Sequence, residues 1–114
     1  MKLIVAGGRN ITDYNLIKAS IDKLNDITEI VSGNASGVDR FGERYAKERG
    51  IDLVIFPANW TKYGQAGGPI RNERMAVYAD ALLAIWDGKS KGTASMIKLA
   101  LKHKLTVWTV KYES

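Results

Sequence analysis

Short runs of apolar residues alternate along this chain with longer segments in which apolar residues recur every three or four positions. A continuous apolar run bounded by glycine or proline is typical of a buried strand, and the wider spacing is typical of an amphipathic helix. The runs predict strands at Lys2–Ala6, Glu29–Ser32, Asp52–Phe56, Ala81–Trp86 and Leu105–Val110. One helix is expected in each interval between successive strands.

The expected helices carry start and stop signals of their own. The first follows the N-cap candidates Thr12–Asp13, the second ends at Gly50, and the third has Pro69 at its first position. The first helix is expected to turn Tyr14, Ile17, Ile21 and Leu24 inward. The second is expected at Ser36–Arg49, with Val38, Phe41, Gly42, Tyr45 and Ala46 inward. The third runs from Pro69 to about Ala79, and the fourth is expected at Thr93–Lys102, with Ile97, Ala100 and Leu101 inward. Ala58–Gly67 is then the longest irregular segment.

This alternation predicts an α/β fold in one domain spanning residues 1–114. A five-stranded parallel sheet with helices on both faces is expected, because strands separated by helices pair in parallel and need cover on each side. Ligands of such sheets bind outside the carboxyl ends of the strands. The segments rich in glycine and arginine all follow strands: Gly7–Asn10, Gly33–Arg40, Asn59–Arg74 and Asp87–Thr93. We therefore expect the functional site at this edge.

Composition limits the chemistry that the chain supports. The 114 residues are 46% hydrophobic and 25% charged, and no apolar run approaches the length of a membrane span. The chain has no cysteine and one histidine, His103, which excludes disulfides, thiolate metal sites and a histidine-rich metal centre. We expect a cytoplasmic protein, of a cell or of a virus-infected host, that holds no metal and no cofactor. The net charge of +5 suits anionic ligands.

Seven cations lie next to glycine-marked turns, in a loop or near helix starts: Arg9, Arg40, Lys62, Arg71, Arg74, Lys89 and Lys91. A helix N-terminus carries partial positive charge, so a cation there is unfavourable unless an anion joins it. Backbone amides and cations at helix starts together make an anion site, and phosphate is the anion most often bound. The pattern predicts a phosphate-binding site.

Three blocks hold the most specific signals, and each has a structural alternative. In Ser32–Asp39 the glycines let the backbone approach a ligand, and Asp39 either bonds a ribose hydroxyl or only complements the helix dipole. In Gly68–Asn72, Arg71 offers a planar fork to phosphate or forms a salt bridge with Glu73 or another carboxylate. In Asp87–Thr93, Gly92 and Thr93 present amides and a hydroxyl to an anion, or Thr93 is an ordinary N-cap.

Two aromatic residues of the long loop, Trp60 and Tyr63, are candidates for stacking on a base. The alternative is a tryptophan that closes the edge of the core beneath the loop. Trp86 and Trp108 lie in expected strands and are assigned to the core, and His103, at a helix end, to a capping or surface role.

Together these blocks resemble the SLOG superfamily, which groups the Smf/DprA proteins with the Lonely Guy phosphoribohydrolases, and within it the small stand-alone YspA/YpsA-related branch. The resemblance extends from Ala6–Arg9 to the last strand and is most specific at Ser32–Asp39, Gly68–Asn72 and Trp86–Thr93. It implies a Rossmann-like three-layer fold with a nucleotide pocket. The expected ligand-binding residues are Gly7, Gly8, Arg9, Ser32, Gly33, Asn34, Gly37, Asp39, Trp60, Arg71, Asn72, Asp87, Gly88, Lys89, Ser90, Gly92 and Thr93.

The chain departs from the Lonely Guy pattern at one chemical position. Aligning the glycine-threonine of that pattern with Gly92–Thr93 puts Met96 where the catalytic glutamate stands, and Lys89 and Ser90 replace paired glycines. Methionine neither donates nor accepts a proton in catalysis, so the remaining catalytic candidates are Asp39, Arg71, Glu73 and Asp87.

The sequence leaves three functions open. The leading hypothesis is a sensor or sequestering protein that binds a nucleotide or nucleotide-derived ligand, such as ADP-ribose or a nucleoside phosphate, at the carboxyl edge of the sheet. The first alternative is a nucleoside-monophosphate phosphoribohydrolase. The second is single-stranded DNA binding, for which no long tract of basic and aromatic residues is present. A homo-oligomer, dimeric or larger, is also expected.

Overall fold

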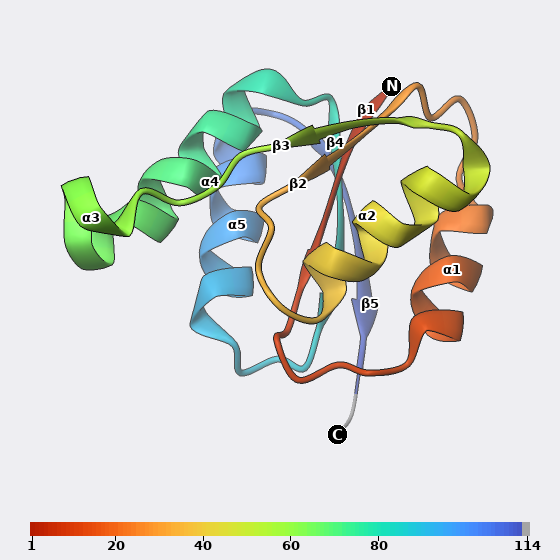
Figure 1. Cartoon of the computed structure of the whole chain (residues 1–114), viewed down its shortest axis with the longest axis horizontal. Helices are drawn as coiled ribbons and strands as arrows, with labels where there is room; N and C mark the ends of the chain where they lie inside the picture. The colour runs from red at the N-terminus through yellow and green to blue at the C-terminus, as the bar shows by residue number, and fades with distance from the viewer. Residues whose placement is uncertain (113–114) are drawn as a thin grey trace.

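The structure, a computed structural model, describes residues 1–112 and has a central sheet between two layers of helices (Figure 1). The strands are β1 (Lys2–Gly7), β2 (Glu29–Ser32), β3 (Asp52–Ile55), β4 (Ala81–Trp86) and β5 (Thr106–Lys111). They pair in parallel in the order β3-β2-β1-β4-β5. The predicted Rossmann-like α/β fold is confirmed, and two strands, β2 and β4, have the predicted bounds.

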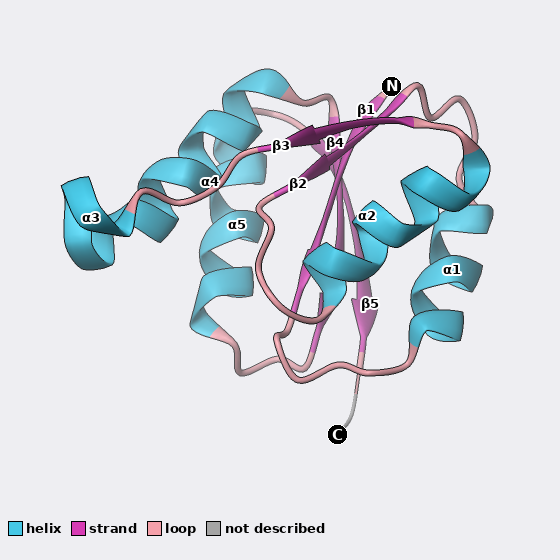
Figure 2. Ribbon diagram, in the orientation of Figure 1, coloured by secondary structure: helices cyan, strands magenta, loops and turns pink. Residues whose placement is uncertain are grey.

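The longer helices are α1 (Tyr14–Asp22), α2 (Val38–Arg49), α4 (Gly67–Tyr78) and α5 (Lys91–Lys102). Figure 2 shows α1 and α2 on one side of the sheet and α4 and α5 on the other. Among residues 1–112, no helix has both the length and the apolar character that crossing a membrane requires.

The core consists of two apolar layers, one on each face of the sheet. Leu3 and Val5 of β1 point to the layer under α1 and α2, and Ile4 and Ala6 point to the layer under α4 and α5. These four side chains are at most 8% exposed, because β1 is the central strand and is covered on both faces. The continuous apolar runs of the sequence are thus explained by two-sided burial.

The helices begin with caps that the sequence only partly predicted. Asp13 is the N-cap of α1, and its side chain accepts a hydrogen bond from the Leu16 amide at 3.2 Å. The N-cap of α5 is Ser90, not Thr93, so this helix begins earlier than predicted. Its inward face was also wrong in one position: Leu101 is 60% exposed, and Met96 is buried instead.

The segment expected to be irregular, Ala58–Gly67, is mostly helical, so that prediction was wrong. It contains the one-turn helix α3 (Trp60–Tyr63) and the 3₁₀ turn η1 (Gly64–Ala66), and α4 follows directly. The cause lies in Asn59, whose side-chain oxygen accepts a hydrogen bond from the Lys62 amide at 3.0 Å and caps the first turn.

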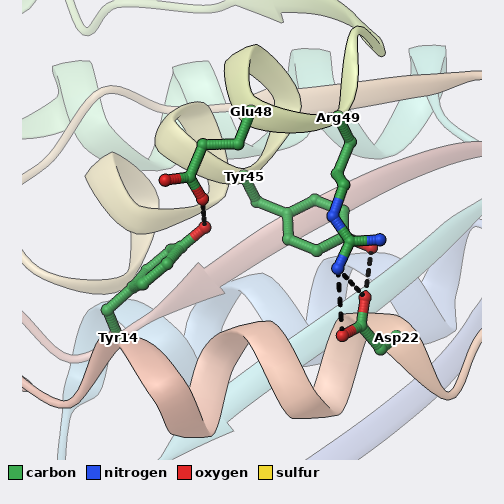
Figure 3. A network of polar contacts seen from close by, with 5 residues as sticks. All are labelled: Tyr14, Asp22, Tyr45, Glu48 and Arg49. Carbon is green, nitrogen blue, oxygen red and sulfur yellow. Dashed lines mark hydrogen bonds and ion pairs between the residues drawn. The ribbon is translucent and has the colours of Figure 1, made fainter.

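A polar network joins α1 to α2 on the outside of the fold (Figure 3). The Tyr45 hydroxyl donates to Asp22 at 2.7 Å, Arg49 lies 3.0 Å from the same carboxylate, and the Tyr14 hydroxyl donates to Glu48. These contacts join the C-terminal half of α2 to α1, and Asp39 lies in the first turn at the other end of the helix.

Candidate functional site

A cleft of about 550 Å³ opens at the carboxyl edge of the sheet, where the loops after β1 and β4 come together. β1 and β4 are neighbours in the sheet although two strands separate them in the sequence. The chain builds outward from β1 through β2 to β3 and then crosses to the other side of β1. Such a reversal of strand order leaves a crevice, which is where ligands of this fold class bind.

Most of the predicted binding residues line this one cleft. They are Gly7, Gly8, Arg9, Asp39, Arg71, Asn72, Asp87, Lys89, Ser90, Gly92 and Thr93. Arg9 comes from the loop after β1, Arg71 from α4 and Thr93 from the first turn of α5. Three segments far apart in the sequence thus line one cleft.

Other predicted residues lie outside the cleft. Gly33, Asn34 and Trp60 line a neighbouring hollow, and Ser32 is fully buried beneath it. Neither Gly37 nor Gly88 lines either hollow.

The catalytic candidate Glu73 also lies elsewhere. Its carboxylate bonds the His103 ring at 2.8 Å, so the salt bridge considered between Glu73 and Arg71 does not form. His103 is the C-cap of α5, as its predicted capping role requires.

Sequence reasoning did not name several residues that line the cleft as binding candidates: Ala6, Asn10, Ile11, Ala35, Met75, Met96 and Tyr112. Asn10 follows Arg9 in the same turn, so its position after a strand was the available signal. Tyr112 directly follows β5, and its amide donates to the Trp86 carbonyl at 2.8 Å, which holds it beside the end of β4. The position of Tyr112, an aromatic residue directly after the last strand, was the sequence feature that could have predicted its place in the cleft.

Arg71 is held by the loop that follows β2. Its Nη1 donates to the Gly33 carbonyl, and its Nε donates to the Asn72 side chain at 2.8 Å. Burial lowers the pKa of Arg71, the Asp39 charge opposes this shift, and Arg9 adds to it. An anion that binds beside a guanidinium stabilises its charged form more when the guanidinium is partly buried and near a second cation than when it is exposed.

Asp39 lies at the back of the cleft and is 6% exposed. Burial raises the pKa of this carboxyl from 3.8 to about 6, and the hydrogen bond from the Ala35 amide and the charge of Arg71 limit the rise. The Glu43 carboxylate, one turn later in α2, pushes the pKa further up. Asp39 is therefore more than a partner of the helix dipole, since it is a desolvated carboxyl beside a cation.

The glycine-rich loop between β2 and α2 uses its amides inside the protein. The Asn34 amide donates to Ser32 Oγ at 3.0 Å, and the Ala35 amide donates to Asp39 Oδ2 at 3.3 Å. Ser32 Oγ in turn donates to the buried Glu43 carboxylate at 2.8 Å. The Asn34 and Ala35 amides therefore have acceptors within the protein and do not point to a ligand.

Gly37 locks this loop to the loop after β1. Its φ is 77°, and a Cβ at this position would lie 2.3 Å from the Gly8 carbonyl oxygen. The same carbonyl accepts a hydrogen bond from the Val38 amide at 3.3 Å. Glycine is required here because no other residue combines this backbone conformation with so close an approach.

The turn before α5 is organised around Asp87. One oxygen of its carboxylate accepts hydrogen bonds from the Lys89 and Ser90 amides, both at 2.8 Å. These two bonds lower the pKa of Asp87, so it is an ionised acceptor and unsuited to act as an acid. Ser90 Oγ then lies 3.2 Å from Thr93 Oγ1, which places two hydroxyls on the wall of the cleft.

Two further hollows continue from the cleft along the sheet edge. The inner hollow, about 280 Å³, is lined by Arg9, Gly33, Asn34, Ala35, Ser36, Pro57, Ala58, Trp60 and Arg71. The outer hollow, about 470 Å³, is lined by Ile55, Phe56, Pro57, Ala58, Asn59, Trp60, Thr61, Arg71 and Arg74. Arg71 lines the cleft and both hollows. Of the seven cations singled out in the sequence, Arg40, Lys62 and Lys91 line none of the three.

Comparison with known proteins identifies the family. The model of the YspA, cpYpsA-related SLOG family (YAcAr) matches residues 1–63, which is more than half of the chain. The chain belongs to this family. Membership confirms the resemblance and implies, in general terms, a nucleotide-related ligand. Among curated proteins, none matches.

A solved structure shows the same fold as this SLOG chain. The X-ray structure of DNA processing protein A (DprA) from Streptococcus pneumoniae superimposes with a TM-score of 0.82 at 17% sequence identity. The match covers 98% of this chain and 50% of the DprA chain, so the SLOG chain spans about half the length of that protein. At this identity the likeness shows the fold alone.

The position of Met96 in the SLOG cleft bears on catalysis. Met96 is 1% exposed and lines the cleft from the second turn of α5. This helix therefore offers a thioether where the Lonely Guy pattern has a glutamate. Among the described residues that line the cleft, the carboxylates are Asp39 and Asp87. No group of three or more metal-ligating histidines, aspartates or glutamates occurs within residues 1–112.

Proposed function

We propose that the cleft binds a nucleotide or nucleotide-derived small molecule through its phosphate, and that the protein acts as a sensor or sequestering protein for this ligand. The observation that carries the proposal is the convergence of Arg9, Arg71 and Lys89 on one cleft at the reversal of strand order. Their charges exceed those of Asp39 and Asp87, the carboxylates lining the same cleft. An anion entering the cleft meets a net positive field.

The phosphate position that fits best lies between Arg9, Lys89 and the start of α5. The hydrogen-bonded pair of Ser90 and Thr93 leaves one hydroxyl hydrogen free to donate there, and the N-terminus of α5 adds partial positive charge. A Cβ at Gly92 would meet no atom within 4 Å, so nothing covers the backbone at this point. The loop after β2 is not used, because its Asn34 and Ala35 amides are engaged within the protein.

Asp39 is suited to the sugar of the same ligand. A carboxylate at the back of a phosphate-binding cleft repels a phosphate but accepts hydrogen bonds from hydroxyl groups. The cleft volume of about 550 Å³ lies within the usual range for small-molecule sites. A ligand that carries both a phosphate and vicinal hydroxyls, as a ribose phosphate does, therefore matches the two chemistries of the cleft.

The proposal is tested by calorimetric titration with AMP, ADP, ADP-ribose and inorganic phosphate. At least one nucleotide is expected to bind, and Arg9→Met, in the cleft beside Lys89 and the start of α5, is expected to weaken binding about tenfold or more, which is the loss of one charged hydrogen bond. Arg40→Met is the matched control, because Arg40 is exposed and lies outside the cleft. Silence of every probe, or equal losses in the two variants, would refute the proposal.

A second candidate function is hydrolysis of the N-glycosidic bond of a nucleoside monophosphate. The observation in its favour is the raised pKa of Asp39, about 6, which leaves a fraction of the carboxyl protonated near neutral pH. In this reaction the oxygen of water bonds to the anomeric carbon, the bond to the base nitrogen breaks, the protonated carboxyl gives its proton to the departing base, and the proton that the water loses returns the carboxyl to its protonated form. Incubation with AMP followed by chromatography for adenine tests it, with Asp39→Asn expected to abolish release.

Two further expectations stay predictions. Single-stranded DNA binding has no feature of the cleft in its favour and would show as affinity that falls steeply with salt. Association into a homo-oligomer is measured by sedimentation of the purified protein.

A further inference from the structure

Trp60 is held in place by glycines of the following helix. A Cβ at Gly67 would lie 3.2 Å from Trp60 Cε3, and one at Gly68 would lie 3.2 Å from Trp60 Cη2. The benzene half of the indole therefore rests against the first turn of α4 at a separation that side chains there would crowd. The Asn59 cap holds the single turn of α3 that presents the ring. Local sequence on both sides thus specifies the position of one aromatic ring.

The same ring is left half exposed. Trp60 is 50% exposed although a core position would bury it, so the alternative in which it closes the edge of the core is wrong. It lines both the inner and the outer hollow, together with Arg71. Ile55, at 42% exposure, adds a second apolar surface to the outer hollow, and Arg74 adds a cation. A rigid, exposed aromatic ring beside two guanidinium groups suits a flat, electron-rich ring.

Tyr63, the other aromatic candidate, lacks these features. It lines neither hollow, and its ring lies under the Lys62 ammonium at 5.1 Å. The geometry distinguishes two residues that the sequence left equal.

We propose that Trp60 and the outer hollow form a base subsite, in which the nucleobase of the ligand stacks on the indole while its phosphate occupies the cleft. This inference rests on the proposed function and extends it to the class of ligand. Arg71 lines all three spaces, so it lies where the sugar–phosphate part of the ligand passes from one to the other. The preferred ligands are therefore nucleotides that retain their base, rather than base-free sugar phosphates.

The experiment compares the dissociation constants of AMP, ADP-ribose and ribose 5-phosphate for the intact protein and three variants. The tighter-binding nucleotide is expected to bind at least about fivefold more tightly than ribose 5-phosphate, the lower end of the effect of one stacked base. Trp60→Leu is expected to remove this gap by weakening nucleotide binding more than ribose 5-phosphate binding. Trp60→Phe keeps an aromatic ring and is expected to retain part of the gap. Tyr63→Ala, in the same helical turn, is the control and is expected to retain all of it.

The possible outcomes separate the two proposals. Binding of all three probes with no preference for the base, or an equal loss of all three in Trp60→Leu, would overturn the base subsite and leave the phosphate cleft standing. Loss of the gap in Tyr63→Ala as well would assign the effect to folding of α3 and also overturn the subsite. If none of the probes binds, the proposed function fails, and the subsite fails with it.

Discussion

Relative to the wild type, the variant Asp39→Asn should gain stability as the pH rises through the interval in which Asp39 ionises. Asp39 is 6% exposed, and burial is the largest cause of its raised pKa of about 6. The folded protein therefore binds this proton more tightly than the unfolded chain does. Stability falls with rising pH wherever the folded state holds more protons, which for Asp39 is the interval between about pH 4 and about pH 6.

The size of the effect follows from the same pKa. The difference between 3.8 and about 6, at 1.36 kcal/mol per pH unit, is about 3 kcal/mol. Asparagine does not ionise, so Asp39→Asn lacks this loss. The constant cost or gain of exchanging a carboxylic acid for an amide is the same at every pH. The free energy of unfolding of the variant, minus that of the wild type, should thus rise by about 2.4 kcal/mol between pH 4, where a small part of the loss has already occurred, and pH 7.5.

The assay is urea unfolding followed by tryptophan fluorescence across this pH range. Asp22→Asn is the control with the opposite sign. The hydrogen bond from Tyr45, with the charges of Arg49 and Lys18, lowers the pKa of Asp22, so the stability of that variant relative to the wild type should fall as pH rises. A difference for Asp39→Asn that stays flat or falls would refute the argument. It would mean that burial does not disfavour the ionised form of Asp39.

Two other predictions concern the segments that frame the cleft. Gly37→Ala should lower the free energy of unfolding by about 3 kcal/mol, because φ is 77° and the added Cβ would lie 2.3 Å from a carbonyl oxygen. Gly50→Ala should lower it by only about 1 kcal/mol, because φ is 66° but the added Cβ would meet no atom within 4 Å. Urea midpoints measure both, and equal losses would contradict the close packing at Gly37. Ser90→Ala should cost about 1 kcal/mol as the loss of an N-cap, whereas Ser95→Ala within the same helix should cost nothing measurable, and similar losses in both would assign the cap elsewhere.

The order of elements was predictable because each buried strand is a continuous apolar run that ends in a glycine, a proline or a polar residue. Ala81–Trp86 is an example: five of its six residues are buried, and Asp87 then begins a turn. Helix starts were less predictable where two hydroxyl residues compete. Ser90 and Thr93 both suit an N-cap, and the choice of Ser90 depends on the Asp87 turn that holds the Ser90 amide. That turn is a matter of three-dimensional geometry.

The sequence predicted which loops form the candidate site, but it did not predict which way the backbone N–H groups of those loops point. The rule that functional groups follow strands brought Arg9, Arg71 and Thr93 to one cleft. The same rule does not say which way an amide points, and the buried acceptors Ser32 and Asp39 turn the loop after β2 inward. The sequence also could not predict which exposed cations line the cleft. Arg9 and Arg40 both lie next to glycine turns, and of the two only Arg9 lines the cleft.

We propose that a phosphorylated ligand binds at the carboxyl edge of the sheet between β1 and β4. The most direct measurement is a titration of the isotopically labelled protein with AMP and ADP-ribose, followed by amide chemical shifts. The largest shifts should gather at Gly8, Arg9, Gly92 and Thr93, and the Asp22 and Glu48 region between α1 and α2 should stay unchanged. Shifts confined to that outer region, or none at saturating ligand, would contradict it.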